Sequence, residues 1–225
     1  ETRPVKVRFH ECDLSGLDLS GHVFEGMDFA GAVLSGVKFA GCTLRDVDFS
    51  NACLESADFT RAVLKDTVLA GADLSRAVFI GADLDYCDLN RCALKGADFT
   101  AARLVQVDLE NADFSSARIS GDTCFRLCCL KSASFAGMDV KRCDFSDSDL
   151  SRAEMTGVDL SFAVLTQVNF TAADLSRSIL AHARARFADF TGARLVGADL
   201  KQADLQGARF DSADAASADF SSAAL

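Results

Sequence analysis

A hydrophobic residue recurs at every fifth position along almost the whole chain. The series starts at Phe9 and runs unbroken to Ile119, slips by one residue across Gly121-Asp122, and resumes from Phe125 to Leu225. Of its 44 positions, 39 are Phe or Leu, and 16 of the 18 Phe lie on it. A period of five matches neither an amphipathic helix nor a simple strand, so the backbone is expected to bend at each repeat.

The residues around each hydrophobic centre also repeat. Two positions earlier the side chain is small, with Ala at 24 of the 44 sites, and the residue in between is commonly Asp. If the small residue and the Phe or Leu both point inward, four repeats make one square coil of about twenty residues. Coils stacked at about 4.8 Å give a rod of about 11 coils, roughly 53 Å long. The pattern predicts an all-β parallel β-helix, with the slip near 120–124 absorbed as a local bulge.

Residues twenty apart test this geometry, because side chains stacked on one wall of a solenoid should be alike. The column that begins Phe9, Phe29, Phe49 ends Phe170, Phe190, Phe210 once the slip is counted. A second column carries Phe at 39, 59, 79 and 99. Phenylalanine therefore runs in vertical ladders, as stacked coils require.

The five-residue units resemble the A(D/N)LXX unit of the pentapeptide-repeat family. The clearest are ADFTR at 57–61, ADLSR at 72–76 and ADLKQ at 198–202. The resemblance covers nearly the whole chain and implies a right-handed quadrilateral β-helix, a handedness that spacing alone does not provide. The unbroken repeat predicts a single domain over 1–225. By resemblance, members include gyrase-binding DNA mimics of the quinolone-resistance type, secreted bacterial effectors and lumenal proteins of photosynthetic membranes.

Candidate chemistry is sparse. The three histidines, His10, His22 and His182, are scattered, and no acid, base and nucleophile separate from the repeat background. We therefore expect no enzymatic activity, no cofactor and no metal; the cysteines at 124, 128 and 129 lack a plausible fourth ligand. Six of the nine cysteines occupy the small inward site, where a free thiol acts as a compact apolar group. This favours reduced thiols and a reducing compartment.

No segment of the sequence is suited to span a membrane. The longest run without charge, from Leu160 to Ala173, has 14 residues, which is too short. We expect a soluble protein. The chain begins at Glu1 and not at Met, which leaves open that a targeting segment has been removed.

The acidic charge follows largely from the repeat. The net charge is −10, and 21 of the 33 acidic residues are Asp immediately before the inward residue. Duplex DNA carries one charge per about 1.7 Å, or about 31 over the length of this rod, so the net charge density here is about a third of that. A negative field disfavours direct binding to nucleic acid. DNA mimicry stays open as the minority interpretation.

The sequence therefore favours a non-catalytic protein-binding or scaffolding solenoid, a subunit or adaptor of a larger assembly. The alternative is a DNA-mimicking regulator of a type II topoisomerase, of the gyrase-protection type. Candidate interaction residues are Ile80, Tyr86, Val105, Phe162, Val196, Phe220 and Leu225. The last two lie at the C-terminal face, where the repeat runs to the last residue without a cap. We expect this face to be covered by a partner protein, a second copy or a further segment.

One inward position is unusually small. Ala185 lies between Leu165 and Leu205 on the same wall. Because protein interiors leave few voids, we expect Phe187 or a neighbouring wall to lean inward there. Phe187→Ala should then destabilise the protein more than Phe162→Ala.

Overall fold

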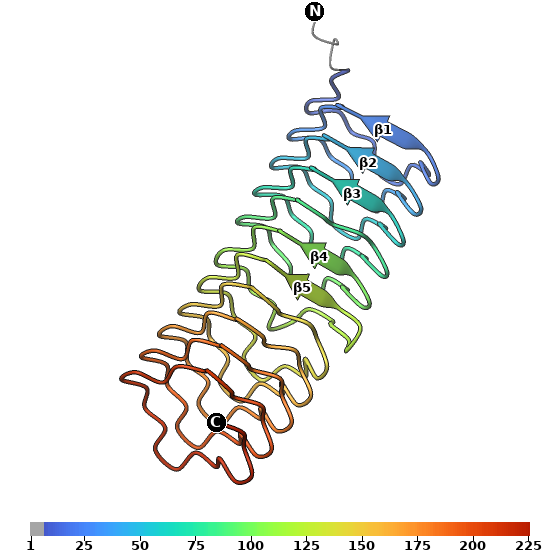
Figure 1. Cartoon of the computed structure of the whole chain (residues 1–225). Coiled ribbons are helices and arrows are strands. Elements are labelled where there is room, and N and C mark those ends of the chain that lie inside the picture. Colours follow the sequence, from blue (N-terminus) through green and yellow to red (C-terminus); the bar gives the residue numbers. More distant parts are fainter. Residues whose placement is uncertain (1–6) are drawn as a thin grey trace, which may run out of the picture.

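The computed structural model describes residues 7–225, which wind into a stack of coils (Figure 1). Parallel bridges join residues 20 apart, from Arg8–Asp28 to Asp204–Ala224. Residues 7–225 contain no helix. The all-strand fold predicted from the period is therefore confirmed for this range, while residues 1–6 of the predicted domain lie outside it.

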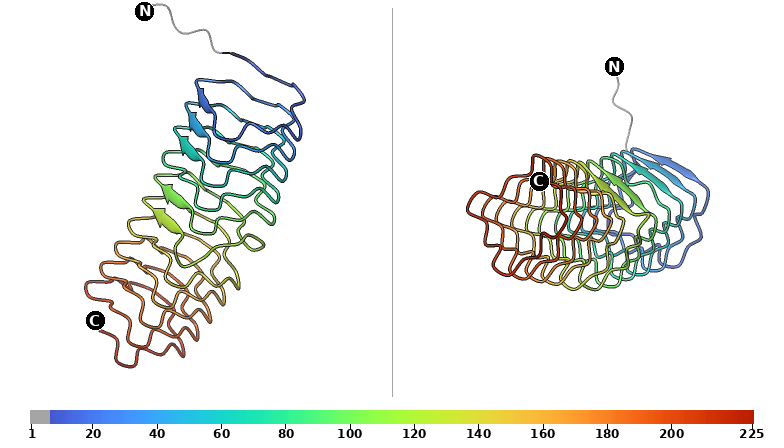
Figure 2. Two further views of the ribbon diagram at one scale, coloured as in Figure 1. Left: turned by 90° about the vertical axis from the view of Figure 1, so that its right-hand side faces the viewer. Right: turned by 60° about the horizontal axis from the view of Figure 1, so that its bottom comes forward.

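Each coil has four walls, and each wall holds one central Phe or Leu per coil. We number the first three walls from their first central residues: wall 1 from Phe9, wall 2 from Leu14 and wall 3 from Leu19. The fourth, which starts at Phe24, is called the strand wall because it holds all the assigned strands, which line up along one side of the stack (Figure 2). These are β1 (Val23–Glu25), β2 (Thr43–Arg45), β3 (Val63–Lys65), β4 (Arg103–Val105) and β5 (Cys124–Arg126).

The central residues fill the interior. Nearly all of those from Phe29 to Leu205 are buried, and the aromatic ones stack along the rod. The rings of Phe59 and Phe79 are 5.0 Å apart and parallel, and those of Phe79 and Phe99 are also 5.0 Å apart. Ladders of like side chains thus hold successive coils in register, which explains why Phe clusters in columns.

The residue two positions after the centre turns the corner with a left-handed backbone at nearly every repeat, Ser116 and Gly121 being the exceptions within residues 7–225. Glycine does this without strain, as at Gly31 (φ 66°), but Asn51, Tyr86 and Phe162 adopt φ values of 56°, 62° and 61°. Left-handed geometry costs a non-glycine residue about 1–2 kcal/mol. The corner N–H offsets part of this cost by bonding the next coil, as Asn51 N does to Ala70 O at 2.9 Å. Side chains at corners project outward.

The aspartate before each centre stabilises the same turn. In all 21 cases its Oδ1 accepts the backbone N–H of the residue two positions later; Asp48 and Ser50, for example, are joined at 2.9 Å. This is the local hydrogen bond by which Asp favours turns. Most of the acidity of the protein therefore has a structural cause within each repeat.

Polar side chains at the small inward site are satisfied between coils. The Cys42 thiol donates to Leu19 O at 3.0 Å, the Cys87 thiol to Leu64 O at 3.0 Å, and the Thr67 hydroxyl to Leu44 O at 3.3 Å. Burial raises the pKa of the Cys87 thiol to about 12, and that of Cys128 likewise. All nine cysteines are free thiols, and these buried ones are unreactive near neutral pH.

The slip is confined to one corner. Paired residues of neighbouring coils are 20 apart in the sequence on both sides of the slip and 21 apart across it. Arg103 thus pairs with Cys124, and Cys124 in turn pairs with Asp144. Wall 3 absorbs the change: within residues 7–225, the bridge column stops at Arg118 and begins again at Asp139. The Thr123 hydroxyl anchors the turn by donating to Phe99 O at 2.9 Å.

The expectation that Phe187 fills space at Ala185 is wrong. Ala185 is fully buried, whereas the Phe187 side chain is 63% exposed and covers the Gly207 corner of the next coil. The left-handed corner directs the ring outward. Phe187 therefore does not reach the core, although it is only two residues from Ala185 in the sequence. Phe162, at an equivalent corner, is 50% exposed. The inferred difference between the Phe187→Ala and Phe162→Ala variants therefore loses its basis.

Candidate docking face

The strand wall has the least acidic flat surface of the four walls. The residues directly before and after each central residue point outward, and on this wall they include six cations and five anions, a net of +1. The cations are Arg45, Lys65, Arg103, Arg126, Arg184 and Arg186, and the anions are Glu25, Asp83, Asp85, Asp144 and Asp204.

The other walls are acidic at the same positions. Wall 1 carries eight anions and three cations, wall 2 seven and two, and wall 3 seven and four. Their net charges are therefore −5, −5 and −3. Charges on one flat surface add to a common potential. At the sites beside each centre, the strand wall is therefore nearly neutral, whereas the other three walls are negative and repel an acidic partner.

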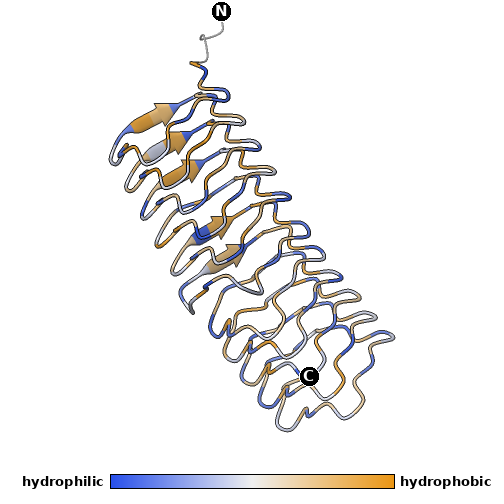
Figure 3. Cartoon of the chain, turned by 180° about the vertical axis from the view of Figure 1, so that it is seen from behind, coloured by the Kyte–Doolittle hydropathy of each residue, from blue (hydrophilic) through white to orange (hydrophobic). Residues whose placement is uncertain are grey.

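Exposed apolar side chains also gather on the strand wall and its two edges. Val23 in β1 is 68% exposed and Val63 in β3 is 39% exposed. The corner that leads to wall 1 carries Tyr86, Leu127 and Phe187, with exposures of 49%, 47% and 63%, together with three aspartates at 46, 66 and 147. Figure 3 shows the chain from behind, with the strands along one side; the hydrophobic colour on them comes largely from the inward Phe and Leu at their centres. Large apolar side chains beside a few charges are typical of protein-binding surfaces.

A stacked aromatic pair forms the other edge, at the corner that leads from wall 3. The rings of Phe162 and His182 lie 4.7 Å apart at an interplanar angle of 3°. The Arg142 guanidinium lies over the opposite side of Phe162, 5.8 Å from the ring centre. The stack orders three side chains that would otherwise be mobile at the surface, which lowers the entropy cost of a contact there.

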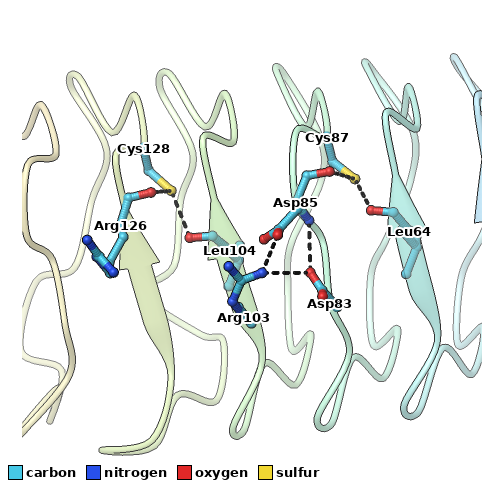
Figure 4. A network of polar contacts seen from close by, with 8 residues as sticks. All are labelled: Leu64, Asp83, Asp85, Cys87, Arg103, Leu104, Arg126 and Cys128. Carbon is cyan, nitrogen blue, oxygen red and sulfur yellow. Dashed lines mark hydrogen bonds and ion pairs between the residues drawn. The ribbon is translucent and has the colours of Figure 1, made fainter.

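An acidic pair lies near the middle of the strand wall (Figure 4). Arg103 Nη1 is 3.3 Å from Asp83 Oδ1 and also contacts Asp85 Oδ2, so two carboxylates share one guanidinium. Burial and the neighbouring Asp85 raise the pKa of Asp83. Asp85 Oδ1 is buried without a hydrogen-bond partner. Negative charge is therefore only partly neutralised here.

The reverse imbalance occurs towards the C-terminus of the same wall. Arg186 Nε is 2.6 Å from Asp204 Oδ2. Arg184, in the same coil, is exposed and makes no ion pair with any residue of 7–225. Only one of the two guanidiniums has a carboxylate partner here, so positive charge is in excess.

The structure separates the seven residues that the sequence singled out. Tyr86 and Val105 lie together on the strand wall, where Tyr86 N donates to Val105 O at 2.9 Å, and Phe162 lies on its other edge. Ile80 belongs to wall 3 and Val196 to wall 2, so neither joins this face. Phe220 is partly buried and Leu225 is 79% exposed. Their role in binding stays a prediction.

Sequence reasoning missed Val23, Val63, Leu127 and Phe187. Their positions in the repeat held a usable signal, because the site before a centre and the corner site both face solvent. What the sequence did not reveal without the coil geometry is that these residues share one side of the rod with Arg45, Lys65 and Arg184.

Catalytic and metal chemistry is not evident in the described part of the chain. Residues 7–225 contain no group of three His, Cys, Asp or Glu side chains placed to hold a metal ion. A recess of about 260 Å³ at a corner of wall 1 is lined by Ser50, Asn51, Gly71, Asp88, Asn90 and Arg91, among others. The same range has no helix that could cross a lipid bilayer.

These features define the class: an elongated parallel β-solenoid. The particular family follows from profiles of repeat sequences. The profile for a pentapeptide repeat region matches residues 5–79, and the profile for pentapeptide repeats (8 copies) matches 92–121, 128–167, 159–195 and 193–225. The chain belongs to the pentapeptide repeat family.

Solved structures of similar proteins come from several sources. HetL from the cyanobacterium Nostoc sp. strain PCC 7120, involved in heterocyst differentiation regulation, is 28% identical, with 93% of this chain and 90% of that one covered and a TM-score of 0.37. A pentapeptide repeat protein of the Arabidopsis thaliana thylakoid lumen is 32% identical over 43% and 67%, with a TM-score of 0.42. Full-length QnrB1, a plasmid-mediated fluoroquinolone resistance protein, is 22% identical over 88% and 93%, with a TM-score of 0.49. No curated protein matches the chain.

Proposed function

We propose that this protein is a non-catalytic scaffold whose strand wall docks another protein chain. The observation that carries the proposal concerns the flat surfaces between the corners: at the sites beside each centre, the strand wall has a net charge of +1 and exposed apolar side chains, against −3 to −5 on the other three walls. Charged surfaces remain hydrated, whereas a near-neutral wall loses less solvation free energy when it is covered.

The finer features of the scaffold belong to the same proposal. We take the chain as one right-handed solenoid domain of about eleven coils over 1–225, in a reducing compartment that suits its nine free thiols. A rigid rod with a flat face suits an adaptor or subunit of a larger assembly, because docking orders few side chains.

The alternative of a DNA-mimicking topoisomerase regulator is less well supported. The aspartates that would imitate phosphates are engaged in turns, and cations interrupt their columns; Lys38 lies 3.3 Å from Asp18 and Arg209 lies 3.3 Å from Asp189. A DNA supercoiling assay with a type II topoisomerase tests this alternative directly. Inhibition or protection that survives changes to the strand wall would favour mimicry over docking.

Two valines provide a matched test of docking. Val63 lies on the strand wall and Val33 on wall 2, both directly before a central residue, with exposures of 39% and 38%. Proteins that are captured from a cell extract and quantified should be lost with Val63→Glu and retained with Val33→Glu. Equal capture by the two variants, or equal loss, would rule out the strand wall as the docking face.

A further inference from the structure

Two units of the strand wall have the same layout with opposite charge. Asp83-Leu84-Asp85-Tyr86 places carboxylates before and after its centre and an aromatic ring at the corner. Arg184-Ala185-Arg186-Phe187 places guanidiniums at the same two sites and a ring at the same corner. We propose that a second copy of this chain docks on the strand wall with these two units in contact. The inference rests on the proposed docking function and names its occupant.

Each unit has charge to spare. Asp83 and Asp85 share the single guanidinium of Arg103, and the pKa of Asp83 is raised by burial and by Asp85, as expected for a carboxylate short of cationic partners. Arg184 makes no ion pair within residues 7–225, while Arg186 contacts Asp204. The rings of Tyr86 and Phe187 each have one covered side, from Lys65 and from the Gly207 corner, but are 49% and 63% exposed, so the open parts of the rings can pack on each other across a contact.

Symmetry determines how two copies fit. With a two-fold axis along the strand direction, the coils of the copies run in opposite order and each repeat position meets the same position. The bridged column from Asp83 to Arg184 passes through Arg103, Cys124, Asp144 and Val164. An axis midway between Cys124 and Asp144 therefore sets Asp83 opposite Arg184, Asp85 opposite Arg186 and Tyr86 opposite Phe187. Each contact then occurs twice.

Charge selects this register. It places no two like charges directly opposite on the strand wall: Lys65 meets Gln206, Arg103 meets Val164 and Arg126 meets Ser146. A shift by one coil in one direction sets Lys65 against Arg186 and Arg126 against its own copy. A shift in the other direction sets Asp83 against Asp204 and Arg103 against Arg184.

The parallel arrangement and the other walls are less favourable. With the two-fold axis along the rod, each coil meets itself, so Asp83 faces Asp85 and Arg184 faces Arg186. Contact through the same wall of two copies brings net charges of −5 or −3 together on walls 1 to 3. The antiparallel contact of strand walls avoids both penalties.

The contact is modest in size. With coils spaced by about 4.8 Å, the facing strand walls cover roughly 500 Å² on each copy. A total of about 1,000 Å² is the lower limit for a specific interface, so the dimer should be weak and should form only at high protein concentration. Its dependence on ion pairs should make it dissociate as salt is added.

Sedimentation velocity of the full chain over a concentration series provides the test. Wild type should shift from monomer to dimer at low salt. Arg184→Glu with Arg186→Glu should weaken dimerisation by at least an order of magnitude, because both symmetric contacts become repulsive. Lys95→Glu with Arg194→Glu on wall 2 changes the net charge equally and should leave the dimer intact.

A charge exchange separates a specific contact from a general charge effect. Asp83→Arg with Asp85→Arg should also abolish the homodimer, yet an equimolar mixture of this variant with Arg184→Glu/Arg186→Glu should form a heterodimer, since every opposite pair is restored. Should the arginine variant fail to fold, Asp83→Asn with Asp85→Asn keeps the side-chain oxygen that accepts the Asp85 N–H and should still weaken dimerisation.

Three results would overturn the proposal: a monomer at every concentration, a dimer indifferent to Arg184→Glu/Arg186→Glu, or folded exchange variants that do not pair. A monomer whose capture of other proteins is lost with Val63→Glu would leave the docking function standing with a different occupant. If the chain dimerises but the Val63→Glu and Val33→Glu variants capture the same proteins, self-association would be the sole use of this wall.

Discussion

The strand wall and wall 2 lie on opposite sides of the same coils and share one interior. Both are built on central Leu and Phe residues that are buried over most of the rod, and both use Asp to cap turns. Outside they differ: wall 2 has a net charge of −5 at its outward sites, whereas the strand wall has +1 and the bordering aromatic residues. Inward positions thus build the coil while outward positions are free to define a face.

The largest expected effect should be the same on both walls. Phe145 of the strand wall stacks on Phe125 at 5.1 Å, and Phe135 of wall 2 stacks on Phe114 at 4.8 Å. Truncation of either to Ala removes a fully buried ring and leaves a cavity, at a cost of about 3–5 kcal/mol. Chemical denaturation should give two similar losses. A loss confined to one wall would mean that the core is not shared.

A smaller effect is expected where the walls pass the slip. A Cβ on Gly121 would lie 2.8 Å from the backbone oxygen of Lys141, so Gly121→Ala forces the next coil to move, at about 1–3 kcal/mol. At Gly137, which has φ +69° and open space, Ala should cost only about 1 kcal/mol. Thermal denaturation of the two variants measures the difference, and a more harmful Gly137→Ala would contradict this account of the bulge.

The pH dependence of stability should have opposite signs on the two walls. Hydrogen bonds from the hydroxyl and N–H of Ser15 hold the pKa of Asp13, on wall 2, below its ordinary value. Its contribution to stability is therefore present above the unfolded pKa and is lost as pH falls through the folded one. For Asp83 the pKa is raised, so its ionised form is disfavoured in the fold and stability decreases as pH rises through that pKa.

Two variants separate these signs. Asp13→Asn should destabilise the protein at neutral pH, with a difference from wild type that vanishes in acid. Asp83→Asn should be neutral or stabilising at neutral pH, and urea denaturation from pH 3 to 7 measures both. If both substitutions change the free energy of unfolding in the same direction, the carboxylates around Arg103 are not crowded.

The smallest expected effect concerns the outward valines. Because Val63 and Val33 occupy the same repeat position with similar exposure, Val63→Glu and Val33→Glu should each change the free energy of unfolding by less than about 0.5 kcal/mol. Thermal denaturation provides the check. Any difference in binding between them then reflects the face and not the fold, whereas a marked loss of stability for Val63→Glu alone would invalidate it as a probe of docking.

The sequence by itself determined the coil. The five-residue period, the Phe columns and the small inward sites required a stack with eight inward residues per coil, and the phase of the pattern located the slip. These features depend on local bends and on which side chains avoid water, both of which repeat along the chain. They were sufficient to identify the family before any coordinates were considered.

The tertiary structure decided which distant residues share a side. Tyr86 and Val105, or Asp83 and Arg103, become neighbours only because the chain closes a coil between them, and Phe187 turns outward because its corner has a left-handed backbone. The sequence also did not show whether each Asp acts as a turn cap or as a free surface charge. Charge sidedness is a sum over residues twenty apart, so it emerges only when walls and corners have positions in space.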